Sequence, residues 1–284
     1  MGDRAFYRHY LLLAVPMILQ NAITNLVSFL DNIMVGQLGT EQMSGVAIVN
    51  QLIFVYNLAI FGAVSAASIF GAQYFGNGDH RGHMHSFRFK LYATLLVSGL
   101  TMLLLLTKGS DLISLYLTDT AGNGATDVAL QYGKQYLVIM LVGLVPFAVN
   151  QAYATNIKET GQTLVPMLAS FVAVGTNAVL DYLLIFGVGP FPELGVTGAA
   201  LATVIARYVE AVIVVFWAHR NREKNRYLEE AYRGFGISVS ELKTILIKGL
   251  HLMFNEVLWA AGMTTVTQCY SVRGRDVVDG RNIA

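Results

Sequence analysis

The stretch "YLLLAVPMILQNAITNLVSFLDNIMV", residues 10–35, is an apolar run that carries a single acidic residue, Asp31, near its end. As a helix it is long enough to cross the hydrocarbon core of a bilayer, which is about 30 Å thick. The apolar core of a signal peptide has only about 7–15 residues, so we interpret the run as an uncleaved first membrane span. Backbone polar groups must be satisfied inside lipid, which makes such spans helical. Comparable runs predict six more helices, at 46–75, 87–107, 130–156, 163–187, 195–218 and 244–270.

Composition agrees with an all-α integral membrane protein. The chain is 55% hydrophobic and 13% charged with a mean hydropathy of +0.53, whereas soluble domains carry about 25% charged residues. The net charge of +1 gives no indication of nucleic-acid binding. The single cysteine, Cys269, cannot form an internal disulfide or a cysteine-rich metal site. His80, His83 and His85 lack a metal-ligand spacing, and we expect them to be solvated in a basic loop.

The distribution of Lys and Arg predicts the orientation in the membrane, because cytoplasmic connections carry an excess of both. The opposite side has few, Lys108 and Lys134 in the third connection. The N-terminus and the second, fourth and sixth connections carry Arg4, Arg8, Arg81, Arg88, Lys90, Lys158, Arg220, Arg222, Lys224, Arg226, Arg233 and Lys243. The N-terminus and the linker at 219–243 are therefore predicted to be cytoplasmic. The tail after the seventh span departs from this pattern, with arginines at 273, 275 and 281.

A faint internal repeat indicates how the chain is organised. A shift of 235 residues aligns several positions, such as Gly39 with Gly274, and parallel repeats of this kind are common in secondary transporters. The shift predicts a six-helix lobe at 1–218, a cytoplasmic linker at 219–243 and the start of a second lobe at 244–284, which we expect to be truncated.

Polar side chains recur every three or four residues in the first span, at Gln20, Asn21, Thr24, Asn25, Ser28, Asp31 and Asn32. This period places them on one helical face. A face of this kind is expected to meet protein or a water-filled cavity, with helix–helix hydrogen bonding as the simpler alternative. The second span adds Asn50 and Asn57, and the sixth carries Arg207 and Glu210, which we interpret as a structural ion pair.

Three carboxylates are candidates for function. Asn177 and Asp181, four residues apart, stack on one helical face. Counted from the cytoplasmic helix starts at 1.5 Å per residue, Asp31 and Asp181 lie at similar depths of roughly 30 and 27 Å. They are therefore expected to share a cavity, unless each simply reaches the outer interface. Glu256 lies nearer the midplane, where ionisable residues are usually functional. Pro16 and the proline at 146 each remove a backbone hydrogen bond and permit a bend.

Several segments together resemble the multidrug and toxic compound extrusion (MATE) family: "DNIMVGQLGTEQMSGVAIVNQL", "FGAQYFGNGD", "KETG", "NAVLDYLLIFGVGPFPELGVTGAALATVIAR" and "NEVLWAAGMTTVTQCYSVRG". The resemblance implies a fold of twelve helices in two six-helix lobes around a cavity that opens alternately to each side. The chain would then comprise the N-terminal lobe and the seventh helix. It also implies a monomeric transporter of the bacterial inner membrane, not an enzyme, which has no cofactor and exports cationic or amphipathic drugs in exchange for H⁺ or Na⁺.

The resemblance also assigns roles to residues. Asp31, with Pro16 as the helix-bend residue, matches the first-helix aspartate of proton-coupled relatives, and Asn177 and Asp181 match partners on helix five. The asparagine expected on helix four has no clear counterpart, because the matching position is Ala154 and Asn150 lies one turn earlier.

Sodium-coupled relatives have a carboxylate on helix seven, which Glu256 matches. Na⁺ would thus bind either at Glu256 or at the cluster of Asp31 and its partners. Gln20, Asn21 and Asn25 complete the predicted cavity.

Two other functions are considered. A lipid-linked oligosaccharide flippase has a similar two-lobe fold, but such cavities tend to be strongly cationic and the intramembrane charges here are mostly acidic. A prenyl-transferring membrane enzyme would need clustered aspartates for Mg²⁺-diphosphate, and the sequence has no such cluster. A non-transporting truncated remnant is the third alternative.

Overall fold

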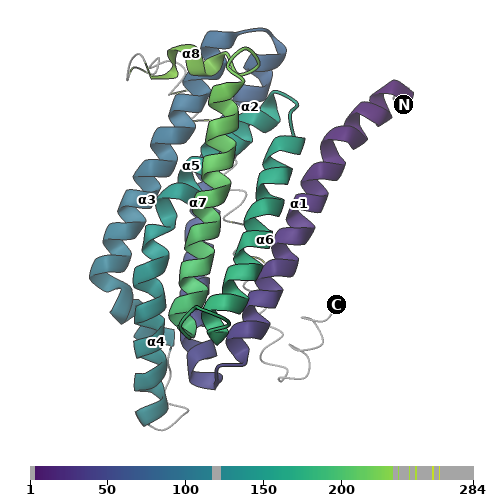
Figure 1. The fold of residues 1–284 in the computed structure, drawn as a ribbon. Coiled ribbons are helices and arrows are strands. Elements are labelled where there is room, and N and C mark those ends of the chain that lie inside the picture. The colour runs from purple at the N-terminus through teal and green to yellow at the C-terminus, as the bar shows by residue number, and fades with distance from the viewer. Residues whose placement is uncertain are drawn as a thin grey trace.

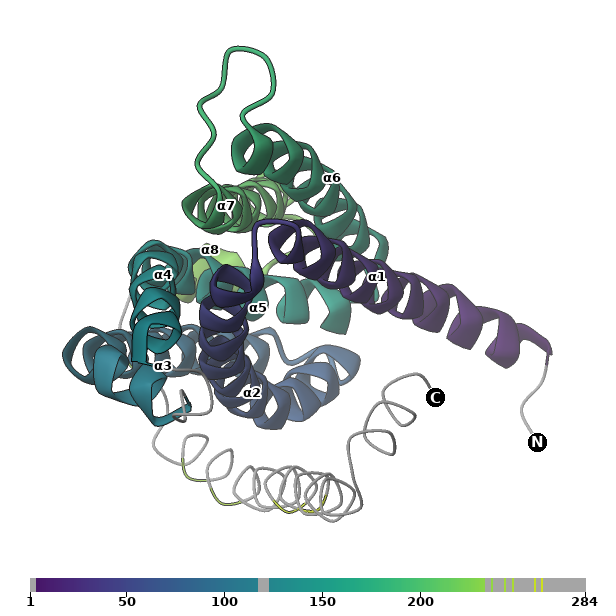
Figure 2. The ribbon, with the colours of Figure 1, turned by 90° about the horizontal axis from the view of Figure 1, so that it is seen from below.

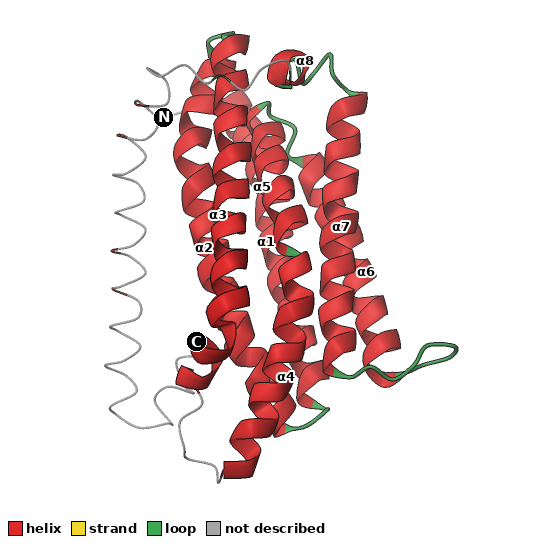
Figure 3. Cartoon of the chain, turned by 90° about the vertical axis from the view of Figure 1, so that its left-hand side faces the viewer, coloured by secondary structure: helices red, strands yellow, loops and turns green. Residues whose placement is uncertain are grey.

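The computed structural model describes residues 4–116 and 123–232, together with the isolated positions 236, 243, 247, 258 and 262. Within these ranges every regular element is a helix (Figures 1 and 3). The helices are α1 (Arg4–Gly36), α2 (Thr40–Gly76), α3 (His80–Tyr116), α4 (Asn123–Val142), α5 (Leu144–Glu159), α6 (Leu164–Phe186), α7 (Val196–Arg220) and α8 (Tyr227–Ala231). Glu256, the tail and the predicted seventh span, apart from the isolated positions 247, 258 and 262, lie outside the described residues.

Five helices are long and apolar enough to cross a membrane, and the bent pair α4–α5 makes six if it counts as one span. The first six predicted spans thus each coincide with a helix or with this pair. Helix α6 packs between α1 and α7, and α2 packs against α3, α4 and α5 (Figure 2). The N-terminal end of α1 and the short helix α8 lie at the same end of the bundle (Figure 1).

The predicted span at 130–156 is not one straight helix, because α4 and α5 meet at Gly143 with a bend of 44°. Pro146 has no N–H to donate to the carbonyl four residues earlier, and its ring crowds that carbonyl. Side chains from other helices bind the carbonyls at the break. Arg207 donates to Gly143 O at 3.4 Å, and Tyr56 donates to Leu144 O at 2.8 Å.

Close contact between α2 and α4 depends on glycine. A Cβ atom at Gly45 would lie 2.4 Å from Ala129 O and 2.8 Å from Gly133 N. No side chain fits in this space, so the two backbones approach more closely than other residues would allow. The approach lets the apolar faces of α2 and α4 meet in the main core of the bundle.

The histidine prediction was wrong for His83. Asp79 accepts hydrogen bonds from the backbone N–H groups of Arg81 and Gly82, so the basic stretch continues as the first turns of α3. Its inner face is buried, and His83 lies 3.3 Å from Glu159 of α5 with only 2% of its surface exposed. His85 is half-buried, whereas His80 is exposed as predicted.

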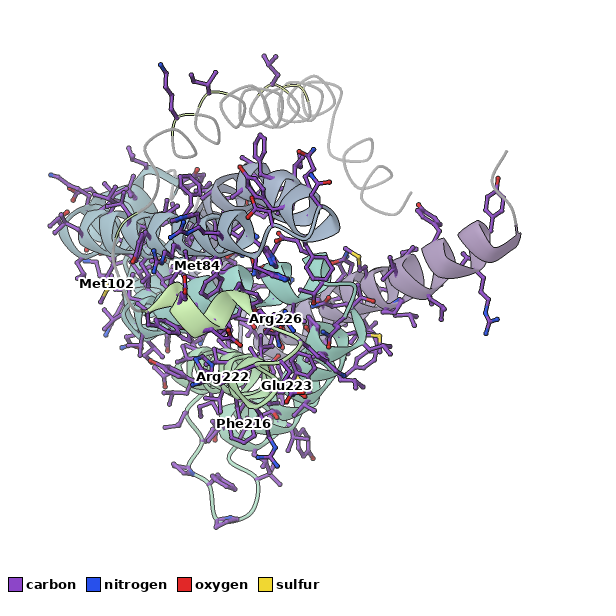
Figure 4. The ribbon with its side chains drawn as sticks, turned by 90° about the horizontal axis from the view of Figure 1, so that it is seen from above. Met84, Met102, Phe216, Arg222, Glu223 and Arg226 are labelled. Atoms are coloured by element: carbon purple, nitrogen blue, oxygen red, sulfur yellow. The ribbon has the colours of Figure 1, made fainter. Side chains whose placement is uncertain are left out.

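Two cations assigned to the second connection are also buried in α3. Lys90 is fully buried, donates to Asn156 at 2.7 Å and forms an ion pair with Glu159. Arg88 donates to three backbone carbonyls at and beyond the end of α8, those of Glu230, Ala231 and Gly236. These bonds satisfy carbonyls that a helix end leaves without partners, and they hold α8 across the end of the bundle. Figure 4 shows α8 from this end, with Met84 and Arg226 labelled.

Candidate functional site

The carboxylates of Asp31 and Asp181 face each other where α1 packs against α6. Each lies five residues before the end of its helix, at 36 and 186. Asp181 is 1% exposed and Asp31 is half-buried, and the two side chains are close enough to interact directly. Neither carboxylate oxygen of Asp181 has a well-formed hydrogen bond to a described residue. A buried acid without partners is costly, and two charged carboxylates repel, so a proton or a cation would relieve both penalties.

The remaining predicted residues of this cluster fall on both sides of α1 and α6. Asn177 is buried one turn before Asp181 and interacts with it. Asn150 is buried on α5, its side-chain oxygen has no partner among the described residues, and it does not hydrogen-bond to Asp181. Asn21 and Asn25 are exposed on α1. The predicted polar face of the first span is therefore divided between α6 and the outer surface of the described bundle.

A second polar contact joins α1 to α6 and α7 nearer the other end of the bundle. Gln20 donates to Ser170 Oγ at 2.6 Å, and the Ser170 hydroxyl donates to Glu210. Glu210 is thus engaged by Ser170, and the predicted ion pair with Arg207 was wrong, because no such pair forms between these two residues. Pro16 is buried four residues before Gln20, within a helix α1 that continues through it.

A cavity of about 410 Å³ opens beside the aspartate pair, between α1, α2, α4 and α7. Its polar lining comes from Asp31, Asn32, Asn50, Gln51, Asn57, Tyr136, Thr203 and Arg207. Tyr136 donates to Asn50 at 3.2 Å and interacts electrostatically with both aspartates and with Arg207. The volume lies within the range of about 300–1,000 Å³ that is typical of small-molecule sites. The lining combines polar side chains with the apolar side chains of Ile53, Phe54 and Met140, so it can contact both polar and apolar parts of a ligand.

Sequence reasoning missed Tyr136 and Thr203. Tyr136 is one of several tyrosines in apolar runs, and its position does not distinguish it. Thr203 lies four residues before Arg207 and therefore on the same helical face, which is the one signal that pointed to it. In the described part of the chain, no group of three or more His, Cys, Asp or Glu residues is placed to hold a metal ion.

The crossings, the buried carboxylates and the polar cavity together are typical of a multi-pass membrane transport protein. Comparison with known proteins identifies which kind. The family described as MatE matches residues 16–183, and the chain belongs to this family, whose members are transporters and not enzymes.

Curated bacterial relatives are similar over most of this chain. Probable multidrug resistance proteins NorM are 28% identical over 211 residues in Thermotoga maritima, 27% over 257 residues in Bacillus licheniformis and 30% over 224 residues in Rhizobium meliloti. These matches cover 74%, 89% and 78% of this chain and 44%, 55% and 46% of the relatives. The chain therefore spans about half the length of these proteins and corresponds to their N-terminal lobe.

Solved structures share the fold. An outward-facing multidrug resistance MATE transporter of the MOP superfamily has a TM-score of 0.79 at 22% identity, over 94% of this chain and 56% of that one. A MATE protein in the bent conformation has a TM-score of 0.78 at 23% identity, over 94% and 57%. A MOP superfamily transporter from Pyrococcus furiosus with a binding pocket of reverse polarity has a TM-score of 0.75 at 21% identity, over 95% and 57%.

Proposed function

We propose that this chain forms the N-terminal lobe of a secondary active exporter of cationic, amphipathic compounds that works by antiport with H⁺ or Na⁺. The observation that carries the proposal is the juxtaposition of Asp31 and Asp181 between α1 and α6, beside a cavity that reaches Asp31. The multidrug resistance names of the relatives support the substrate class. The lobe extends over 1–218, and the linker at 219–243 connects it to a second lobe, of which residues 244–284 are the first part.

The aspartate pair couples transport because its charge can alternate. When both acids are ionised they repel each other, and a proton, a sodium ion or a cationic substrate relieves the repulsion. The proton, the sodium ion and the substrate then compete for the same site at the aspartate pair. The oxygens of Asp31, Asn177 and Asp181 would hold Na⁺, since hard cations favour oxygen ligands. Each charge that moves through 100 mV contributes about 2.3 kcal/mol, which corresponds to roughly fifty-fold accumulation of a substrate.

The described part of the cavity supports an exporter of cations rather than a flippase. A site that holds a lipid-linked pyrophosphate needs several cations, whereas this cavity has Asp31 and the neighbouring Asp181 against the single cation Arg207. We place the protein in the inner membrane of a bacterium as a monomer, with a cytoplasmic N-terminus. No nucleic acid takes part in this function.

The test replaces Asp31 with Asn. The gene is expressed together with its native flanking sequence in cells that lack their own drug exporters. Asn keeps the size and polarity of Asp but cannot change charge, so we expect ethidium efflux from energised cells to fall to the background. Asp111→Asn is the matched control, because Asp111 is an exposed acid on α3. Efflux at the wild-type rate by Asp31→Asn, at equal expression, would remove the coupling role from this residue.

A further inference from the structure

Arg207 of α7 lies at the edge of the cavity with most of its hydrogen-bonding capacity unused. Its guanidinium group stacks on the Phe147 ring, 5.1 Å from the centroid, and makes one long hydrogen bond to Gly143 O at 3.4 Å. A guanidinium has five N–H donors. No described carboxylate lies within ion-pair distance of it. Glu210, three residues further along α7, acts on it only at longer range and accepts a hydrogen bond from Ser170.

The cavity therefore has two poles of opposite charge. Asp31, backed by Asp181, forms the acidic pole on α1, and Arg207 forms the basic pole on α7. Tyr136 of α4 lines the same cavity as both poles and donates to Asn50. Phe54, Ile53 and Met140 provide apolar surface in the same cavity. A ligand with one charge would leave one pole unmatched.

We propose that Arg207 binds the anionic group, in particular a carboxylate, of a zwitterionic amphipathic ligand whose cationic group lies at Asp31. This inference rests on the proposed function and adds a substrate class to it. Arginine suits the role because its planar fork matches the two oxygens of a carboxylate. Hydrogen bonds between ionised partners are also the stronger kind.

The two structural contacts of Arg207 use little of what an arginine offers. The contact with Phe147 requires only a flat or apolar side chain, and the carbonyl of Gly143 would accept a bond from any amide. An unpaired guanidinium at a half-buried position is costly, and a carboxylate bound at the cavity would compensate this cost.

Two dyes that differ in one group provide the probe. Rhodamine 19 is a zwitterion with a free carboxylate, and rhodamine 6G is its ethyl ester and carries only the positive charge. Their binding to the purified full chain in lipid nanodiscs can be followed by fluorescence anisotropy. We expect Arg207→Met to weaken binding of rhodamine 19 by about tenfold or more, since charged hydrogen bonds are worth at least that factor. Binding of rhodamine 6G should stay within about twofold of wild type or become tighter.

Two further variants make the outcome decisive. Arg207→Lys keeps the charge and should restore part of the preference for rhodamine 19, while Arg220→Met removes an exposed arginine from the same helix and should change nothing. Equal weakening of both dyes by Arg207→Met would show that Arg207 only supports the fold and would overturn the proposal. If Asp31→Asn abolishes binding of rhodamine 6G while Arg207→Met leaves the ratio of the two affinities unchanged, the proposed function stands and this inference fails. Absence of binding of either dye to the wild-type chain would contradict both.

Discussion

Two sets of buried charged residues in this lobe differ in how many hydrogen bonds and ion pairs they form. Lys90, Glu159 and His83 form a network in which each charge has a partner, and Lys90 also donates to Asn156 Oδ1. The carboxylate of Asp181, by contrast, lacks well-formed hydrogen bonds to described residues although it is almost fully buried. A satisfied polar network rigidifies a fold, whereas an open one stays available to an ion. The first set therefore fits a structural role, and the second fits the coupling role proposed above.

The structural role of the network gives a stability prediction. Lys90→Met leaves Glu159 buried with only His83 beside it, and breaking a buried pair costs about 3–5 kcal/mol. Unfolding of the purified protein in SDS, followed by circular dichroism, should begin at a clearly lower SDS fraction. The control is Lys108→Met, because Lys108 and Asp111 form an exposed pair, 65% and 69% accessible, and such pairs contribute at most about 1 kcal/mol. Equal effects of both variants would contradict the structural role of the network.

At the scale of the helices, close packing and bending position the cavity. The contact at Gly45 brings α2 against α4, and the bend at Gly143 turns α5 away from the axis of α4. Together they place Asn50 of α2 within hydrogen-bonding distance of Tyr136 of α4. The polar lining of the cavity therefore depends on these two backbone features as much as on the lining residues.

Two glycine substitutions should have opposite effects. An added methyl group at Gly45 would overlap the backbone of α4, and overpacking costs about 1–3 kcal/mol, so Gly45→Ala should lower the midpoint of thermal unfolding. Gly99, on α3, has open space around its Cβ position. Gly99→Ala should therefore raise the midpoint, because the replacement restricts the unfolded chain and contributes about 0.4–1 kcal/mol. A stabilised Gly45→Ala variant would show that the approach of α2 to α4 is looser than described.

Local patterns predicted the spans and the nearness of Asp31 and Asp181, but not most of the other contacts between helices. The lengths of the apolar runs located six crossings, and residue counting placed Asp31 and Asp181 at one depth, because both depend only on helix rise. The burial of His83 could not be predicted, since it depends on Glu159, 76 residues later, which neutralises a stretch that looks like a basic loop. The ion pair between Arg207 and Glu210 was predicted wrongly for the same reason, because residues distant in sequence decide it. Their spacing on the helix allowed a pair, but Glu210 accepts a hydrogen bond from Ser170 and Arg207 donates to the carbonyl of Gly143.

For the whole molecule, the cations gather at one end. The end of the bundle that carries α8 also contains four segments with Lys or Arg residues (Figure 1). They are the N-terminus of α1, the turn between α2 and α3, the end of α5 and the stretch after α7. Arg222 and Arg226 are on this end (Figure 4). The aspartate pair lies toward the opposite end, close to the ends of α1 and α6. If the basic end is cytoplasmic, the proposed coupling site is nearer the outer side, from which protons or sodium ions would enter down their gradients.

This orientation leads to a direct labelling prediction. Single cysteines can be introduced at two exposed positions in a Cys269→Ser background, with Glu193→Cys in the loop between α6 and α7 and Lys224→Cys after α7. A membrane-impermeant maleimide added to intact cells should label the cysteine at 193 and not the one at 224. After the cells are opened, both should react, which shows that each thiol is accessible. Labelling of the cysteine at 224 alone in intact cells would show that the topology is the reverse of the predicted one. The aspartate pair would then lie nearer the cytoplasm, and a proton entering from outside would have to cross the whole lobe to reach it.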